Sequence, residues 1–193
     1  MLILAIQTSP NSDGLTATMA KEVIEGAELA GADTRLIELR SLDVHSCLAC
    51  EKGWGRCARE QKCIIEDDFE VVRLQMAQAA GLVVSTPVYF GEVSEITKNF
   101  FDRLRRCELG LRENSPLRGK PVIGISAAGG SGGGVVTALE QLERYFRVLA
   151  MQVFDLITVT QLSRGHKCLM AEQAGKALVR HICPPEPKLD PDE

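Results

Sequence analysis

Four of the chain's seven cysteines lie within residues 47–63, where even spacing along 193 residues would place fewer than one. Their spacing is C-x2-C-x6-C-x5-C, and the residues are Cys47, Cys50, Cys57 and Cys63. Four thiolates drawn from one segment are a ligand set for an iron–sulfur cluster or for a zinc ion. Four unligated thiols along a loop are the third interpretation, and the spacing leaves all three open.

A hydroxyl-rich stretch at residues 8–16 follows an apolar run and precedes a helical pattern. Peptide N–H groups at a helix N-terminus, together with side-chain hydroxyls, can bind a phosphate without any lysine or arginine. The stretch does not contain the P-loop signature. Its Ser, Asn and Asp residues also favour turns and helix caps, so a purely structural role stays open.

Two further segments could contact a flat ring system. Tyr89 and Phe90 stand side by side in a segment expected to be a loop, in a chain whose aromatic content is only 5%. Such side chains suit an aromatic ligand, although covering the end of a sheet would explain them equally well. Residues 129–134 are nearly all glycine, which lets a backbone approach a ligand closely.

The glycine-rich segment also matches, formally, the nucleophile elbow of a serine hydrolase. Ser131 is the central residue of a G-x-S-x-G pattern, and Asp155 and His166 follow in the order that a hydrolase triad needs. Because glycine fills most of the segment, the match arises easily, and it would leave the hydroxyl-rich and aromatic segments unexplained. We therefore predict that Ser131 shapes the loop and is not a nucleophile.

The elements that must position these residues alternate along the chain. Apolar runs without polar alternation indicate strands buried on both faces at Leu2–Ile6, Leu82–Val84 and Val122–Ile125, and Thr34–Leu39 and Val153–Val159 complete the set. Helical patterns occupy Leu15–Leu29, Asp67–Ala80, Ser94–Cys107, Val135–Leu149 and Leu169–Ile182. This order predicts a three-layer α/β sandwich, in which ligands bind beyond the C-terminal ends of the strands.

Composition and charge limit the class of protein. We expect one domain over residues 1–183, with a cysteine-rich insertion at 45–66 and a proline-rich surface tail at 184–193. The net charge of -4 argues against a nucleic-acid partner, and no apolar run approaches membrane-spanning length. Seven cysteines without a signal peptide predict reduced thiols in the cytoplasm. Asp102 and Arg103 are expected on a solvated helix face, with Lys98 paired to Asp102.

Several of these segments together resemble the NADPH-dependent FMN reductase and iron–sulfur flavoprotein family. The resemblance is carried by residues 8–16, by Cys63–Asp68 and by Thr86–Ser94, with Lys98, Phe100, Asp102 and Arg103 in the helix that follows. It covers most of residues 1–160, and Pro87-Val88-Tyr89-Phe90-Gly91 is its most specific part. Members with a cluster typically show C-x2-C-x2-C, whereas this chain inserts four residues after Cys50 and keeps the C-x5-C that follows.

The resemblance implies a flavodoxin-like fold with a five-stranded parallel sheet of order 2-1-3-4-5, bound FMN, and a homodimer or homotetramer. It implies that the FMN phosphate is held by Ser9, Asn11, Ser12 and Thr16. By the same resemblance, the flavin ring is lined by Pro87, Val88, Tyr89, Phe90 and Gly91, with Ala128, Gly129 and Gly130 on its other side.

The function that the resemblance implies is an FMN-dependent oxidoreductase. It would take electrons from NAD(P)H and pass them to a quinone, an iron–sulfur centre or another small acceptor, with a 4Fe–4S cluster as a second cofactor. No catalytic acid or base is required, because the cofactor carries the chemistry. The alternative is a flavodoxin-like binding or regulatory protein that has lost FMN, since this fold serves many functions.

Overall fold

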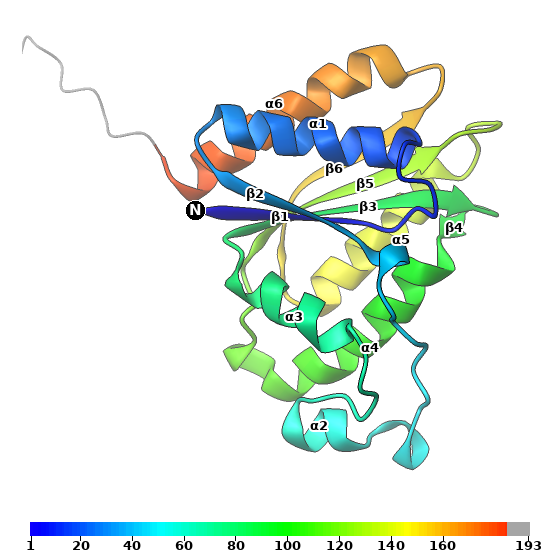
Figure 1. The fold of residues 1–193 in the computed structure, drawn as a ribbon, viewed down its shortest axis with the longest axis vertical. Coiled ribbons are helices and arrows are strands. Elements are labelled where there is room, and N and C mark those ends of the chain that lie inside the picture. Colours follow the sequence, from blue (N-terminus) through cyan, green and yellow to red (C-terminus); the bar gives the residue numbers. More distant parts are fainter. Residues whose placement is uncertain (185–193) are drawn as a thin grey trace, which may run out of the picture.

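A computed structural model describes residues 1–184 and shows a parallel sheet between two layers of helices (Figure 1). The five long strands are β1 (Leu2–Gln7), β2 (Asp33–Glu38), β3 (Gly81–Tyr89), β5 (Pro121–Ala128) and β6 (Gln152–Thr160). They lie side by side in the order β2-β1-β3-β5-β6, and every neighbouring pair is parallel. The short strand β4 (Glu92–Val93) pairs antiparallel with β3.

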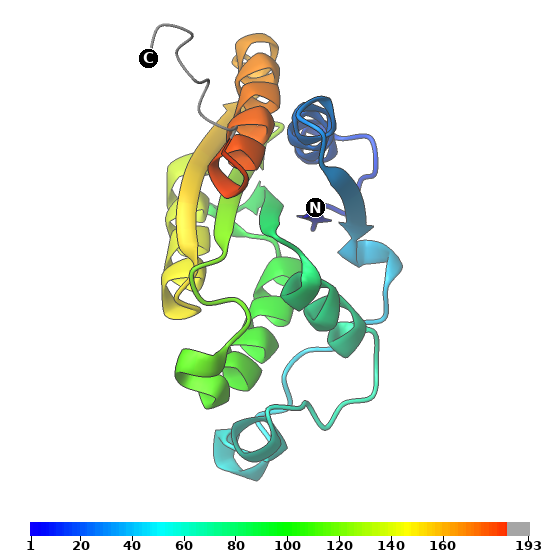
Figure 2. The same cartoon turned by 90° about the vertical axis from the view of Figure 1, so that its left-hand side faces the viewer.

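Each face of the sheet is covered by its own set of helices (Figures 1 and 2). Helices α1 (Leu15–Leu29) and α6 (Arg164–Ile182) pack on one face, over a core that includes Ile3, Val83 and Ile125. Helices α3 (Phe69–Gln78), α4 (Glu95–Leu111) and α5 (Val135–Val148) cover the other. Successive strand residues alternate between these two cores, which explains why the central strands read as continuous apolar runs.

The predicted fold class is confirmed, with differences in detail. The five long strands have the predicted order 2-1-3-4-5 when they are numbered without β4. The short strand β4 was not predicted. β3 continues to Tyr89, so Pro87 and Val88 belong to a strand and not to a loop. α6 begins at Arg164, five residues before the predicted start at Leu169. Of the expected tail at 184–193, all but the first residue lies outside the described residues.

Residues 45–66, predicted to be a cysteine-rich insertion, lie in the connection between β2 and α3. Its only α-helix within the described residues is the short α2 (Arg56–Glu60), which packs against α4 at the end remote from β4 (Figure 1). The contact is close at Gly110, where an added Cβ would meet the Ala58 carbonyl oxygen at 3.2 Å. Among the described residues, no helix combines the length and the hydrophobicity needed to cross a bilayer.

Candidate functional site

The N-terminus of α1 presents free peptide N–H groups to the hydroxyl-rich loop. The Gly14 N-cap is extended and, within the described residues, no side chain caps the helix and its first turn has no acidic residue. The earliest helical N–H bond runs from Thr18 to the Gly14 oxygen, at 2.9 Å. Ser9 and Thr16 are 5% and 4% exposed, so both hydroxyls are partly desolvated. This arrangement favours an anion at the start of α1.

A cluster of buried hydroxyl groups joins the hydroxyl-rich loop to β3 and α4. The Thr8 Oγ1 donates to the Ser85 carbonyl at 2.9 Å and lies 2.6 Å from the Thr97 Oγ1. The Thr97 hydroxyl lies 2.9 Å from the Ser94 Oγ and 3.0 Å from the Thr86 Oγ1. Because these side chains come from three elements, the cluster fixes the loop relative to the aromatic segment.

The aromatic segment is a β-hairpin and not the open loop expected from the sequence. Tyr89 faces Glu92 across the β3–β4 pair, so Phe90 and Gly91 form the turn. Their φ angles, 52° and 81°, are both positive, as a tight two-residue hairpin turn requires. The Phe90 side chain is fully exposed and Tyr89 is 45% exposed. Two aromatic rings therefore project from the C-terminal edge of the sheet.

The glycine-rich loop 129–134 lies against this hairpin. The Thr137 Oγ1 donates to the Gly91 carbonyl at 2.6 Å. Gly134 has φ +82°, and a Cβ added there would stand 2.5 Å from the Gly91 Cα. A Cβ added at Gly129 or Gly130 would have no other atom within 4 Å, so the space beside these two glycines is open. The hairpin and the glycine-rich loop therefore meet at Gly91 and Gly134, while Gly129 and Gly130 stay uncovered.

The hydrolase arrangement is not assembled. Ser131 is exposed, and its Oγ accepts a hydrogen bond from the Gly133 N–H. Asp155 pairs in register with Ile123, whereas the loop follows Ala128, which pairs with Thr160. Asp155 therefore lies five strand residues, about 16 Å along the sheet, from the strand end that leads into the Ser131 loop. The carboxylate is therefore out of reach of Ser131, in agreement with the prediction that this serine is not a nucleophile.

A groove of about 940 Å³ lies on the other side of the hairpin, between α4 and α5. Its apolar wall includes Tyr89, Phe90, Phe101 and Tyr145, and the rings of the last two are stacked with centroids 5.1 Å apart. Its rim carries the cations Lys98, Arg105 and Arg144. Lys98 is paired with Asp102, as predicted from their i, i+4 spacing. The same groove is lined by the carboxylates of Glu92, Glu95 and Asp102, so its cations and anions are equal in number and its distinctive feature is the aromatic wall.

The four clustered cysteines line one small cavity of about 20 Å³ beside α4. Within the described residues, no three His, Cys, Asp or Glu side chains are placed to hold a single metal ion. A zinc ion needs its ligands at about 2.3 Å from one point, whereas each thiolate of a four-iron cluster binds a different iron atom. The structure therefore gathers the four cysteines around one cavity without forming a single-metal site among the described residues.

The backbone around this cavity is strained. Ala49, Glu51 and Lys52 have φ of 47°, 50° and 60°, a region that costs each residue about 1–3 kcal/mol. A Cβ added to Gly55 would lie 2.8 Å from the Cys50 Sγ. Such strain accumulates at ligand-binding loops. The fifth cysteine of the wall, Cys107, is fully buried, and burial raises the pKa of its thiol to about 12.

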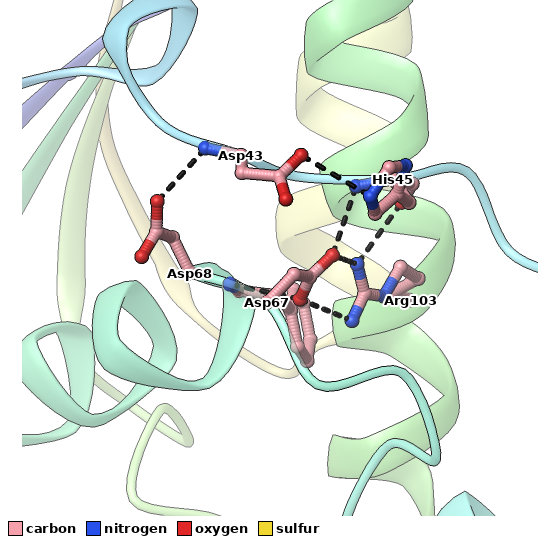
Figure 3. A network of polar contacts seen from close by, with 6 residues as sticks. Asp43, His45, Asp67, Asp68 and Arg103 are labelled. Atoms are coloured by element: carbon pink, nitrogen blue, oxygen red, sulfur yellow. Dashed lines mark hydrogen bonds and ion pairs between the residues drawn. The ribbon is translucent and has the colours of Figure 1, made fainter.

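Both ends of the insertion are tied to α4 by a polar network (Figure 3). Arg103 donates from Nη1 to Asp67 Oδ2 at 2.5 Å, from Nη2 to Asp67 Oδ1 at 2.8 Å, and from Nη1 to the His45 carbonyl at 3.0 Å. Burial alone would raise the Asp67 pKa, but Arg103 and the His45 and Phe69 N–H groups hold the pKa below its ordinary value. The Asp68 carboxylate accepts from the Asp43 N–H at 2.8 Å.

The expectation that Arg103 lies on a solvated face is wrong. Its side chain is 1% exposed, and its guanidinium carbon lies 4.2 Å from the centre of the Phe69 ring. The sequence reasoning also missed the hydroxyl cluster formed by Thr8, Thr86, Ser94 and Thr97. The available signal was that Thr8 directly follows β1 and Ser94 directly precedes α4.

Comparison with known proteins decides the family. A family model described as NADPH-dependent FMN reductase matches residues 1–161. The chain belongs to the NADPH-dependent FMN reductase family. The prediction of a flavin oxidoreductase with FMN as cofactor and NAD(P)H as electron donor is thereby confirmed.

Two relatives of this FMN reductase family member are named for an iron–sulfur centre as well as for a flavin. An iron–sulfur flavoprotein of Archaeoglobus fulgidus is 30% identical over 157 residues, 81% of this chain and 74% of that protein. An iron–sulfur flavoprotein of Methanocaldococcus jannaschii is 29% identical over 153 residues, covering 79% and 75%. The family resemblance stated from the residues is thereby confirmed.

Solved structures bear out the flavodoxin-like fold of this FMN reductase family member. An NAD(P)H:quinone oxidoreductase of Methanothermobacter marburgensis superposes with a TM-score of 0.72 at 14% identity, covering 92% of this chain and 96% of that one. A WrbA-like flavodoxin of Agrobacterium tumefaciens gives 0.62 at 18% identity, covering 94% and 96%. At such identities the likeness concerns the fold alone.

Proposed function

We propose that this FMN reductase family member binds FMN across the C-terminal edge of its sheet and passes electrons from NADPH to a small acceptor and to a cluster held by its four clustered cysteines. The observation that carries the flavin site is the uncapped N-terminus of α1, which shares one edge with the aromatic hairpin and the glycine-rich loop. When bound, FMN supplies hydride acceptance and the release of electrons singly or in pairs.

The residues of the edge fit the parts of FMN. The phosphate is held by the α1 N-terminus and by Ser9, Asn11, Ser12 and Thr16, in a loop shaped by a 2.8 Å bond from Gln7 Nε2 to the Asn11 oxygen. The ring lies between the hairpin residues Pro87, Val88, Tyr89, Phe90 and Gly91 and the loop residues Ala128, Gly129 and Gly130. The groove beside the hairpin suits the approach of the flat nicotinamide ring of the electron donor, because its wall is aromatic.

Replacing Thr16 with Val is expected to raise the dissociation constant of FMN about fivefold or more. The substitution removes one hydroxyl from the phosphate site, and a hydrogen bond to a charged group contributes about 1 kcal/mol or more. The measurement is a titration of apo-protein with FMN, followed by flavin fluorescence. Thr18→Val is the matched control, because the Thr18 hydroxyl bonds within its own helix to the Gly14 carbonyl, at 3.2 Å.

Two results would contradict this site. No saturable fluorescence change at micromolar protein would favour the binding or regulatory protein that has lost FMN. Equal weakening by Thr16→Val and Thr18→Val would move the phosphate away from the start of α1.

We propose that Cys47, Cys50, Cys57 and Cys63 hold an iron–sulfur cluster. The proposal is supported by their shared cavity, by the strained backbone at Ala49–Lys52 and by the cluster in the names of the relatives. Within the longer stretch that follows Cys50, Glu51–Gly53 form a tight turn with positive φ at each residue, closed by the Gly53 N–H donating to the Cys50 carbonyl at 3.0 Å. The longer spacing is thus compatible with a common cavity.

Full-length protein purified without oxygen is expected to contain about four iron and four sulfide per chain. Cys57→Ser should lose most of both, because the Cys57 side chain is buried in the cavity wall. Cys168→Ser is the control, since Cys168 lies on α6, across the sheet from the cavity. About one zinc per chain and no sulfide would replace the cluster with a zinc site, and the absence of all three elements would leave four free thiols.

Oligomeric state and location extend the proposal. The fully exposed Phe90 beside a large groove is the kind of apolar surface that a second copy covers, which supports a homodimer or homotetramer. Sedimentation of the holoprotein tests this.

All seven cysteines, each within the described residues, are free, which supports a cytoplasmic location.

A further inference from the structure

Two arginines of α4, Arg103 and Arg106, line the cysteine cavity. Arg103 is 1% exposed, and within the described residues its buried Nε has no hydrogen-bond partner. The Nε of Arg106 is likewise buried and, among these residues, without a partner. A buried N–H donor without an acceptor is destabilising and rare in folded proteins. Two such donors at one cavity indicate that acceptors belong there.

The two side chains differ in how their charge is balanced. Arg103 forms an ion pair with Asp67, whose side chain is as fully buried as its own. Arg106 has no carboxylate partner in the part of the chain that is described. Its Nη1 instead donates to the Gly53 carbonyl, and its guanidinium carbon lies 5.5 Å from the centre of the Trp54 ring. Arg106 therefore places a net positive charge, held in a fixed orientation, beside the cysteines.

We propose that Arg103 and Arg106 are positioning residues for the cysteine-bound cluster, an inference that rests on the proposed cluster itself. Their Nε–H groups donate to its sulfur atoms, and the charge of Arg106 raises its reduction potential. Hydrogen bonds to the sulfurs and the net charge nearby are the main levers on such potentials. Four thiolates make the centre negative, and reduction adds one further electron, so a nearby cation stabilises the reduced form more than the oxidised form.

The neighbouring residue provides a matched control. Arg105 lies on the same helix but faces the groove between α4 and α5, not the cysteine cavity. Arg105→Gln and Arg106→Gln change the net charge equally, at adjacent positions. Arg106→Lys keeps the charge while removing the Nε donor. The full chain of each variant is loaded with iron and sulfide without oxygen, and its cluster is titrated potentiometrically, followed by the paramagnetic resonance signal of the reduced form.

At a fixed potential, we expect Arg106→Gln to lower the ratio of reduced to oxidised cluster about tenfold, a shift of about 59 mV to lower potential for one electron. Arg105→Gln should leave the potential unchanged, and Arg106→Lys should recover at least half of the shift. A folded Arg106→Gln chain that no longer takes up iron, while Arg105→Gln does, also supports the proposal, because the anionic centre has then lost its stabilising cation.

Two results would overturn the inference, and they are distinguishable. If the unmodified chain takes up no iron and sulfide, the proposed cluster fails and the inference fails with it. The other result is a cluster that is present but whose reduction potential in Arg106→Gln equals that of the unmodified chain. The same holds if Arg105→Gln lowers the reduction potential as much as Arg106→Gln does. In either case the cluster stands and the role of Arg106 is refuted.

Discussion

Replacing Gly175 with Ala is expected to lower the free energy of unfolding by about 3 kcal/mol. A Cβ at Gly175 would stand 2.0 Å from the Val23 carbonyl oxygen and 2.9 Å from the Ala27 nitrogen. The contact is reciprocal, because a Cβ at Gly26 would stand 1.9 Å from the Glu172 carbonyl oxygen. The obstructing atoms are backbone atoms and cannot rotate away, so α1 and α6 must separate.

Urea denaturation of the full chain measures this effect, and Gly165→Ala is its control. Gly165 lies in the first turn of α6, and a Cβ there would meet nothing within 4 Å. Because alanine has a higher helix propensity than glycine, the control should be neutral or stabilising by up to about 1 kcal/mol. A Gly175→Ala chain within about 0.5 kcal/mol of the unmodified protein would show that the two helices do not meet backbone to backbone.

The regular elements were predictable where local signals agree. Helix α1 has the predicted bounds, because good helix formers are bracketed by a hydroxyl-rich loop and by Gly31, whose φ of +89° suits the end of a helix. β3 was predicted too short, at Leu82–Val84, because its apolar run ends there and the segment from Ser85 through Pro87 was expected to be a loop. Pairing with β1 ends at Ser85, so the missing N–H of Pro87 leaves no bond of that ladder unmade.

The sites were predictable only as far as neighbours in the sequence define them. The four cysteines lie close together along the chain, and the structure places them around one cavity. The arginines that share this cavity come from α4, about 40 residues further on, and nothing local distinguishes the buried Arg103 from the groove-facing Arg105. Which of several cations on a helix is buried depends on where the insertion packs, and that is decided by tertiary contacts such as Asp67 with Arg103.

The second large effect is expected at Gly134, where an added Cβ would press on the aromatic hairpin. It would lie 2.5 Å from the Gly91 Cα and 3.0 Å from the Val88 Cγ1, and the φ of +82° is itself unfavourable for alanine. The hairpin must shift away from the glycine-rich loop. Because the proposed flavin ring lies between these two segments, we expect Gly134→Ala to weaken FMN binding at least about tenfold, or about 1.4 kcal/mol.

Gly133→Ala is the matched control for this effect. At Gly133 the nearest atom to an added Cβ is the Ser131 Oγ, at 3.6 Å, an ordinary contact. FMN affinity should therefore stay within about twofold of the unmodified protein, and fluorescence titration of both apo-proteins makes the comparison. If Gly134→Ala unfolds more easily but binds FMN as tightly as Gly133→Ala, the hairpin does not line the ring. The flavin must then lie elsewhere along the sheet edge, because a shift in one wall of its site cannot leave its contacts unchanged.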